Sequence, residues 1–440
     1  MNRFITTLQT TIEILTLLTL LSRATQASAQ SFVLSSSPKV RESPVSVVAA
    51  DVNGDSKLDL IFANLYLNTL TVLTNNGNGT FTASSTNRVG NEPVSIVAAD
   101  LNGDGKLDLI IANQRGSTLT VLTNNGVGAF ILSATLGAGN CPASIAAADV
   151  NGDGNLDLIS ANRCGNTLTV LTNDGVGAFS LSGTLIAGNG PNSVVAADVN
   201  ADAKLDLISA NGDSNTLTVL TNSGGGMFAL SATLAVGRNP YSVVAADVNG
   251  DGKLDLINAN AFALTVLTNN GSGAFSLSTT LSVRNFPFFI VPSDLNGDGK
   301  TDLIVGNASP GVLTVLSNNG NGTFTSSFEF GVPSEPKSLV AADVNDDGKP
   351  DLISANGESR TLTILLNSPA APSLNIQSES ATTAVLSWSA AVPGYVLQQN
   401  SVLTTTNWVS VTNAAKVVSG VNQVAVVPRA WNNFYRLFRP

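Results

Sequence analysis

Nine residues with the pattern Asp-X-Asn-X-Asp-X-X-X-Asp recur seven times in this chain of 440 residues, and this repetition is the feature that most restricts its fold. The copies are DVNGDSKLD from Asp51, DLNGDGKLD from Asp100, DVNGDGNLD from Asp149, DVNADAKLD from Asp198, DVNGDGKLD from Asp247, DLNGDGKTD from Asp294 and DVNDDGKPD from Asp343. Their first aspartates lie 49 residues apart, except for one interval of 47. Such a period is too long for a coiled coil and suits one four-stranded unit per repeat.

Each copy, called an acidic loop below, alternates oxygen donors as a hard divalent cation requires. Positions 1, 3, 5 and 9 supply side-chain oxygens, position 7 offers its backbone carbonyl, and glycine at position 6 permits a left-handed turn. Oxygen donors without nitrogen or sulfur favour Ca²⁺ over Zn²⁺ or copper, and a flexible loop suits Ca²⁺ better than Mg²⁺. We therefore expect up to seven Ca²⁺ ions. The predicted ligands are Asp51, Asn53, Asp55, Lys57 and Asp59; Asp100, Asn102, Asp104, Lys106 and Asp108; Asp149, Asn151, Asp153, Asn155 and Asp157; Asp198, Asn200, Asp202, Lys204 and Asp206; Asp247, Asn249, Asp251, Lys253 and Asp255; Asp294, Asn296, Asp298, Lys300 and Asp302; Asp343, Asn345, Asp347, Lys349 and Asp351.

Two other interpretations compete with calcium binding by these loops. The residues could form polar turns only, but seven copies would then each hold three mutually repelling carboxylates without a counter-ion. An EF-hand is disfavoured, because helical periodicity is absent and position 12, for example Phe62, is not a glutamate. The fourth loop has Ala201 and Ala203 where most others have glycine. Its turn should cost about 1 kcal/mol more, so we expect weaker binding there.

The N-terminus predicts export of the protein. Arg3, an apolar stretch over 12–21 and the small residues Ala27-Ser28-Ala29 form the pattern of a signal peptide over 1–29. The stretch is too short and too rich in threonine to predict a transmembrane helix, and no later segment has eighteen uninterrupted apolar residues. We expect a secreted or cell-surface protein with no membrane span in the mature chain.

The charge of the chain belongs mostly to the acidic loops. Of 31 acidic residues, 21 are loop aspartates, and the net charge is −10. Bound calcium would neutralise this acidity, so neither nucleic acid nor an anionic membrane is indicated as a partner. The chain has no histidine. Histidine-based catalytic triads and histidine-ligated zinc are therefore excluded.

The segments between the loops predict β-structure. In residues 240–283, β-branched and alanine-rich stretches alternate with Asn-Gly turns and predict four short antiparallel strands. A single four-stranded sheet cannot bury both faces, whereas radial packing of seven sheets can. The predicted fold is all-β, with a seven-bladed β-propeller over 30–367; an open solenoid is the alternative.

The two ends of the repeat array favour a closed ring. In the last six repeats a phenylalanine precedes the first aspartate by 19 residues: Phe81, Phe130, Phe179, Phe228, Phe275 and Phe324. Phe32 stands 19 residues before Asp51 with no repeat in front of it, and the last repeat stops after its third strand, 361–366. The N-terminal strand would therefore complete the last blade.

A second domain is expected after the propeller. Residues 368–372 have the composition of a linker, and residues 373–440 lack the acidic loop. Alternating segments there predict a small β-sandwich with Trp388 and Tyr395 in its core.

The sevenfold acidic loop resembles the FG-GAP/VCBS repeat family, which includes the integrin α-subunit propellers, over about residues 32–367. The resemblance implies that the acidic loops join the first and second strands of each blade on one face. It also implies that ligands bind on the opposite face, between the second and third strands and between successive blades. The segment after Trp388 resembles, more weakly, the fibronectin type III-like modules of secreted bacterial proteins.

On that opposite face the connections differ between repeats, as expected either of a binding surface or of ordinary solvated loops. They include Tyr66, Arg115, Arg163, Asp213, Phe262, Glu358, Ser359 and Arg360 within blades, and Arg41, Glu42, Glu92, Arg238, Tyr241, Arg284, Phe286 and Lys337 between blades. An asparagine ends each second strand, which we interpret as a turn cap rather than a ring of ligands: Asn64, Asn113, Asn162, Asn211, Asn260, Asn307 and Asn356. The only cysteines, Cys141 and Cys164, flank one hairpin, and a disulfide is predicted for an exported protein.

These observations predict a monomeric, non-catalytic binding or adhesion module whose ligand is an extracellular protein or glycan. The alternative is a calcium-dependent polysaccharide-active enzyme, such as a lyase, on the same scaffold. A lyase needs a specialised site beside an open metal position, and the seven loops are too alike to single one out.

Overall fold

The computed structural model describes residues 30–40, 43–369, 374–378, 383–389, 395–400, 407–418, 421–426 and 434–438. The predicted signal peptide over 1–29, Arg41 and Glu42, and positions 370–372 of the predicted linker lie outside these ranges. The described residues form strands and turns without helices. The chain divides into two compact units, of which Phe32–Asn367 is the larger.

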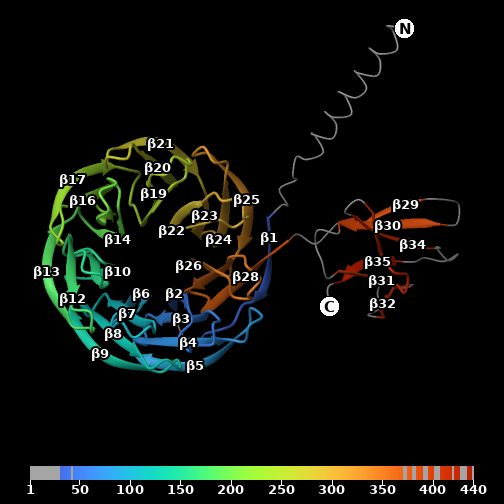
Figure 1. Cartoon of the computed structure of the whole chain (residues 1–440), viewed down its shortest axis with the longest axis horizontal. Coiled ribbons are helices and arrows are strands. Elements are labelled where there is room, and N and C mark those ends of the chain that lie inside the picture. Colours follow the sequence, from blue (N-terminus) through green and yellow to red (C-terminus); the bar gives the residue numbers. More distant parts are fainter. Residues whose placement is uncertain are drawn as a thin grey trace, which may run out of the picture. The chain divides into compact units, whose positions relative to one another are not determined.

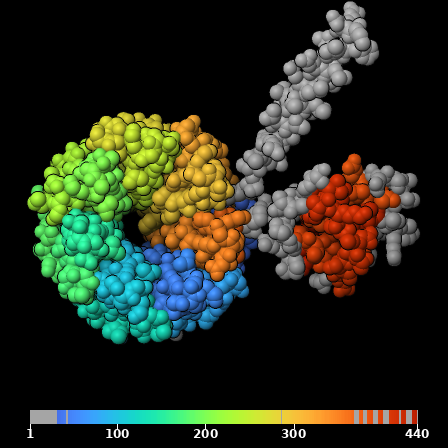
Figure 2. Space-filling view, viewed as in Figure 1, coloured from blue at the N-terminus to red at the C-terminus, as the bar shows by residue number. Residues whose placement is uncertain are grey.

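The larger unit is a seven-bladed β-propeller, whose inner strands surround an open centre (Figures 1 and 2). The first three blades are β2–β5 (Pro44–Ala50, Asp59–Asn64, Thr69–Asn75, Phe81–Arg88), β6–β9 (Pro93–Ala99, Asp108–Asn113, Thr118–Asn124, Phe130–Gly137) and β10–β13 (Pro142–Ala148, Asp157–Asn162, Thr167–Asn173, Phe179–Ile186). The next three are β14–β17 (Pro191–Ala197, Asp206–Asn211, Thr216–Asn222, Phe228–Ala235), β18–β21 (Ser242–Ala246, Asp255–Asn260, Ala263–Asn269, Phe275–Ser282) and β22–β25 (Asn285–Ser293, Asp302–Ser309, Val312–Asn318, Phe324–Gly331). The seventh blade combines β26 (Pro336–Ala342), β27 (Asp351–Asn356) and β28 (Thr361–Pro369) with β1 (Gln30–Ser36).

Each of the first six blades is an antiparallel sheet with its strands in chain order, and in every blade the second strand is the best-buried strand. In β3 and β7 every residue is buried, because a second strand packs against neighbouring blades on both of its faces. Seven apolar clusters join consecutive blades; one holds Ile61 and Val72 of the first blade with Leu109 and Ile111 of the second. Each fully buried leucine or isoleucine contributes about 1.5–3 kcal/mol to folding. The ring is therefore held by its joints as well as by its sheets.

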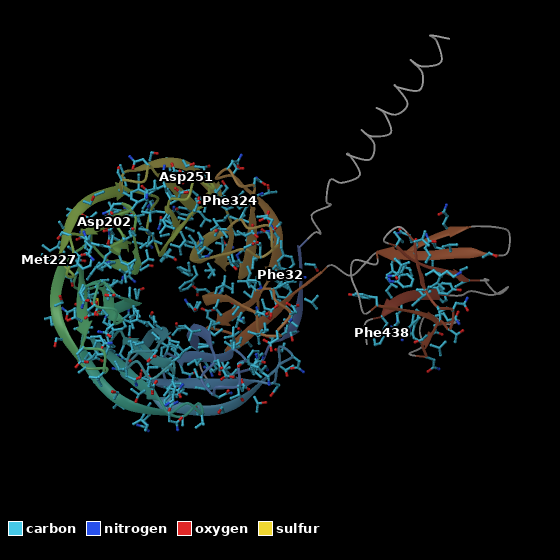
Figure 3. The ribbon with its side chains drawn as sticks, in the orientation of Figure 1. Phe32, Asp202, Met227, Asp251, Phe324 and Phe438 are labelled. Carbon is cyan, nitrogen blue, oxygen red and sulfur yellow. A yellow bond between two sulfur atoms is a disulfide. The ribbon has the colours of Figure 1, made fainter. Side chains whose placement is uncertain are left out.

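The predicted closure of the ring is confirmed. β1 pairs with β28 and completes the seventh blade, so an open array is excluded (Figure 1). Phe32 is 6% exposed and packs among residues of the sixth and seventh blades, such as Leu313 and Leu365. Figure 3 labels Phe32 beside this joint, and Phe324 in the preceding blade. The larger compact unit ends at Asn367, where the predicted propeller ends, and strand β28 runs two residues further, to Pro369.

The smaller unit contains two sheets around one core. One sheet has the order β29-β30-β34-β33 and the other β32-β31-β35. Their strands are β29 (Asn375–Ser378), β30 (Ala384–Ser389), β31 (Val396–Asn400), β32 (Val409–Ser410), β33 (Lys416–Val418), β34 (Val421–Val426) and β35 (Phe434–Phe438). Trp388 and Leu397 come from different sheets and share the core, which makes the unit a β-sandwich.

Trp388 is a core residue as predicted, at 3% exposure. The prediction for Tyr395 is wrong, because this residue precedes β31 and is only half-buried, whereas Tyr435 of β35 packs against the core. The fibronectin type III likeness of this unit stays a prediction.

Candidate metal loops and the opposite face

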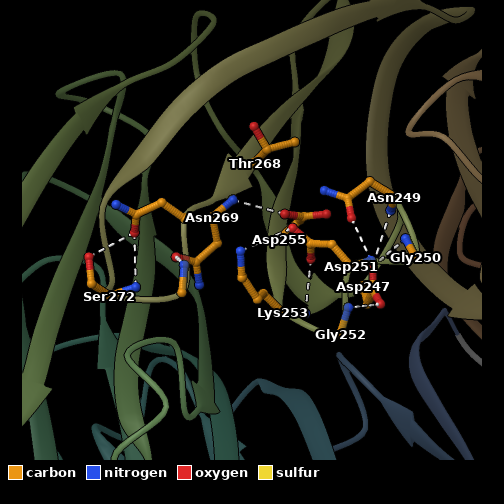
Figure 4. A network of polar contacts seen from close by, with 12 residues as sticks. Asp247, Asn249, Gly250, Asp251, Gly252, Lys253, Asp255, Thr268, Asn269 and Ser272 are labelled. Carbon is orange, nitrogen blue, oxygen red and sulfur yellow. Dashed lines mark hydrogen bonds and ion pairs between the residues drawn. The ribbon is translucent and has the colours of Figure 1, made fainter.

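The acidic loops connect the first and second strands of each blade, and their side chains hold the loop together from inside. In the fifth loop, Asp247 Oδ1 accepts hydrogen bonds from the amides of Asn249 (3.2 Å) and Gly250 (2.7 Å), and its Oδ2 accepts one from Gly252 (2.8 Å). The Asn249 side chain accepts from the Asp251 amide, at 2.8 Å. Figure 4 shows these contacts. The loop therefore winds around the oxygens of positions 1, 3 and 5.

The loop requires a left-handed backbone at positions 4 and 6. Gly250 and Gly252 both have φ of 79°. In the fourth loop, Ala201 and Ala203 adopt the same conformation, with φ of 62° and 64°. Five loops have a hydrogen bond from the glycine amide at position 4 to the first aspartate; in the described fourth and seventh loops, where Ala201 and Asp346 replace that glycine, this bond is absent.

The aspartate at position 9 lies at the base of each loop and is fully buried. Asp255 Oδ1 accepts from the Asn269 amide at 2.9 Å, and its Oδ2 accepts from the Val248 amide at 3.3 Å. Burial raises the pKa of this aspartate in all seven loops, and the neighbouring loop aspartates raise it further. The pKa of Asp351 is raised to about 6. Burial and the neighbouring aspartates therefore both disfavour ionisation of this carboxyl group.

This donor set suits a hard cation, since it consists of carboxylate, amide and carbonyl oxygens only. Positions 1, 3, 5 and 9 would hold the ion with the carbonyl of position 7. Among the described residues, however, no group of three or more acidic, histidine or cysteine side chains is already assembled as a metal cage. The loop amides engage the carboxylates instead, and in five loops the lysine at position 7 pairs with the aspartate at position 5, as Lys106 Nζ does with Asp104 at 3.2 Å. Such exposed ion pairs are weak enough for an ion to displace. Calcium binding stays a prediction.

One residue of this region was not identified from the sequence: an asparagine that ends the third strand in six blades and lies two residues before its end in the seventh. Asn124 Nδ2 donates to the Leu107 carbonyl of its own acidic loop (3.1 Å) and to the Val52 carbonyl of the preceding blade's loop (2.9 Å). The bond to the preceding blade recurs at all seven joints, through Asn75, Asn124, Asn173, Asn222, Asn269, Asn318 and Asn367. The signal was in the sequence, since every repeat has this asparagine 24 residues after its first aspartate, or 22 in the shorter fifth repeat.

The asparagines that end the second strands are turn caps, as predicted. Asn64 Nδ2 donates to the hydroxyl oxygens of Thr69 (3.1 Å) and Thr71 (3.0 Å) on the next strand. The Asn113 and Asn307 side chains are fully buried, and they donate hydrogen bonds to their third strands in the same way. These asparagines therefore fix the hairpin and leave recognition to the residues around them.

On the opposite face, two repeat positions, eight residues before and fifteen residues after the first loop aspartate, are joined by their side chains in the second and third blades. We call them the cross-turn pair. In the second blade the pair is Glu92 and Arg115, which form an ion pair of 3.4 Å. In the third it is Cys141 and Cys164, which form the predicted disulfide, with Cα atoms 5.3 Å apart. The other pairs are Ser43–Tyr66, Gly190–Asp213, Asn239–Phe262, Phe286–Ser309 and Glu335–Glu358.

Two cavities lie at cross-turn pairs. One of about 470 Å³ is lined by Arg115 and Arg163 with the disulfide. The other, of about 590 Å³, is lined by Tyr241, Phe286, Phe288, Ser309, Glu335 and Glu358. Arg284 pairs with Glu329 at 2.6 Å. Eight of the described residues predicted for this face line neither cavity: Tyr66, Asp213, Arg238, Phe262, Arg284, Lys337, Ser359 and Arg360. One cavity is therefore lined by two arginines and Glu92, and the other by aromatic and acidic side chains.

Comparisons with known proteins agree with this architecture. A family model described as FG-GAP-like repeat matches residues 51–111, 100–160, 149–209, 198–258 and 294–354. No curated protein matches the chain in sequence. Within the described residues, no helix is long and apolar enough to cross a membrane.

Several solved structures share the fold at low identity. BBS1N in complex with ARL6DN is 13% identical with a TM-score of 0.59, over 77% of this chain and 98% of that chain. A protein from Lactobacillus plantarum is 16% identical with a TM-score of 0.53, over 67% and 86%. A candidate 6-phosphogluconolactonase from Bacteroides uniformis is 15% identical with a TM-score of 0.53, over 74% and 92%. Identities in this range establish a common fold and nothing further.

Proposed function

The chain belongs to the FG-GAP-like repeat family, and from this premise we propose that it is an exported, calcium-binding β-propeller that acts as a non-catalytic binding module. Its ligand, an extracellular protein or glycan, binds on the face opposite the acidic loops.

The cross-turn pairs are the observation that carries this proposal. All seven blades keep the same acidic loop on one face, whereas the cross-turn position of the other face holds an ion pair, a disulfide, two glutamates and four further combinations. A constant framework with variable, exposed side chains at one end is the usual arrangement of a recognition surface. One protein of the same fold, BBS1N, was crystallised with a partner, ARL6DN, so a protein ligand is compatible with this scaffold.

Calcium has a stabilising role in this proposal. Extracellular modules bind Ca²⁺ with dissociation constants of roughly 0.1–1 mM. At ten times the dissociation constant, each filled loop would add about 1.4 kcal/mol of stability. The backbone carbonyl at position 2 of each loop also accepts a hydrogen bond from the asparagine side chain of the next blade. An ion that orders the loop therefore also strengthens the joint between the two blades.

The test is a glycan and protein array probed with the mature chain, in calcium and in excess chelator. The proposal predicts a saturable ligand whose capture weakens when calcium is removed. Capture of nothing specific under either condition would contradict it. Release of unsaturated products from an acidic polysaccharide would replace it with the lyase alternative.

A further inference from the structure

The seventh blade has an unusual cross-turn pair, because both of its members are acidic. Glu335 and Glu358 occupy the positions that hold an ion pair in the second blade and a disulfide in the third. Both line the cavity of about 590 Å³, and Glu358 is exposed. Two carboxylates at one cavity repel each other unless a cation lies between or beside them. A second feature of the cavity indicates which kind of cation.

Aromatic rings line the same cavity. Tyr241 and Phe288 make an edge-to-face contact with ring centroids 4.5 Å apart, and Phe286 is 39% exposed at the rim. Phe262 extends this surface, with its ring 6.0 Å from that of Phe286. The face of an aromatic ring attracts an organic cation and supplies no oxygen to a metal ion. The walls therefore disfavour a metal ion and favour a cation with an apolar stem.

The protein's own lysine shows how this arrangement holds an ammonium group. Lys337 Nζ lies 2.8 Å from Glu335 Oε2 and 5.4 Å from the centroid of the Phe288 ring. Glu335 is thus paired from within the chain. Glu358 makes no ion pair among the described residues, although it faces the same cavity. One carboxylate and one exposed ring, that of Phe286, are left for a second cation.

We propose that this cavity binds an organic cation, a primary ammonium or guanidinium group on a short apolar stem, between Glu358 and the ring of Phe286. The inference rests on the proposed function, because it names the ligand chemistry of one sector of the binding face. The carboxylate recognises the positive charge of the ligand, and the aromatic ring contacts its apolar stem. A neutral sugar would make no use of the carboxylate's charge. The cation comes either from a free amine or from a lysine or arginine side chain of a protein.

The test is a titration of the full mature chain with agmatine, followed by saturation-transfer NMR. Agmatine carries both cationic groups on a butyl stem, and N-butylurea is its neutral comparator. Saturable binding of agmatine and none of N-butylurea is expected. Glu358→Gln should weaken binding about tenfold, since a charge-assisted contact is replaced by a neutral one. Lys337→Gln should strengthen it, because Glu335 then becomes available to the ligand.

Asp213→Asn is the matched control. Asp213 holds the same repeat position as Glu358 in the fourth blade, is exposed and lies outside this cavity, so its loss should leave agmatine binding unchanged. Peptides with one lysine or arginine in an alanine background distinguish the sources: tighter binding than agmatine indicates a protein side chain, and equal binding indicates a free amine.

Equal binding of agmatine and N-butylurea, unchanged affinity in Glu358→Gln, or no saturable binding of any cationic probe would overturn the inference. The array experiment does not depend on this cavity. If the array captures a ligand while the cavity binds no cation, the further inference fails and the proposed function stands.

Discussion

The side-chain nitrogen Nδ2 of Asn75 lies 2.9 Å from the carbonyl oxygen of Val344, across the joint between the first and last blades. These residues are 269 positions apart in the chain, yet their contact is the same one that Asn124 makes with Val52 at an internal joint. Two features therefore close the ring: β1 forms the outer strand of the seventh blade, and the Asn75 side chain links the first blade to the acidic loop of the seventh. The joint that closes the ring is built like the others.

Asn75→Ala should lower the free energy of unfolding by about 1–3 kcal/mol, because it removes the donor to the half-buried Leu58 carbonyl and the buried Val344 carbonyl. Urea unfolding followed by fluorescence measures this. Asn76→Ala is the control, since the Asn76 side chain bonds only within its exposed turn. Equal stability of the two variants would contradict the role given to Asn75.

Ala203→Gly in the fourth loop should stabilise the protein by about 1 kcal/mol and strengthen calcium binding there, because alanine at φ 64° is strained and glycine is not. Gly252→Ala makes the reverse change at the same position of the fifth loop and should have the opposite effect. Calorimetric titration with Ca²⁺ measures both. Effects of the same sign in the two loops would show that backbone strain does not set their affinities.

In excess chelator, the buried aspartates at position 9 should make the free energy of unfolding fall as pH rises from about 4 to 6. The pKa of Asp351 is raised from 3.8 to about 6, so folding favours its protonated form; this contribution is complete below pH 3.8 and is lost as pH passes the folded value. Asp351→Asn should reduce this loss. Unfolding in urea across this range, with wild type and variant in parallel, checks the slope. Calcium should flatten it, because a bound cation favours the ionised form.

Loss of the disulfide should destabilise the third blade. Cys141 and Cys164 are separated by 23 residues, so their cross-link restricts the unfolded chain and should contribute about 2–4 kcal/mol. The double variant Cys141→Ser, Cys164→Ser should show this loss in thermal unfolding. Adding reductant should lower the melting temperature of the wild type but not of the variant. A variant as stable as the oxidised wild type would contradict the prediction.

Much of the fold could be predicted because the sequence pattern of one blade recurs in all seven. The interval of 49 residues and the position of Phe32 predicted the blades and their closure, and both depend on local patterns. The disulfide followed from the hairpin between its two cysteines. Tyr395 was misplaced, because a single repeat-free segment gives no register, and an aromatic side chain one residue before a strand does not share its alternation.

The joints and the cavities could not be predicted in the same way. Asn75 looks like an ordinary turn residue, and its partner Val344 belongs to another blade, so only the closed ring brings them together. Glu335 and Glu358 could not be recognised as a pair from the sequence either. They are identified only because they hold the repeat positions that the disulfide joins in the third blade. The aspartates at position 9 were predicted as ligands, and the structure shows a role that the sequence did not indicate: each accepts hydrogen bonds from one amide of its acidic loop and one of the third strand.

If the acidic loops are calcium sites that stabilise the ring, the number of ions that the chain holds should match the number of loops. Native mass spectrometry of the mature chain at about 1 mM free Ca²⁺ should find up to seven ions, with the fourth loop filling last, and chelation should lower the melting temperature. A chain that retains no calcium under these conditions, and melts at the same temperature with and without chelator, would show that the acidic loops neither bind calcium nor use it to stabilise the ring.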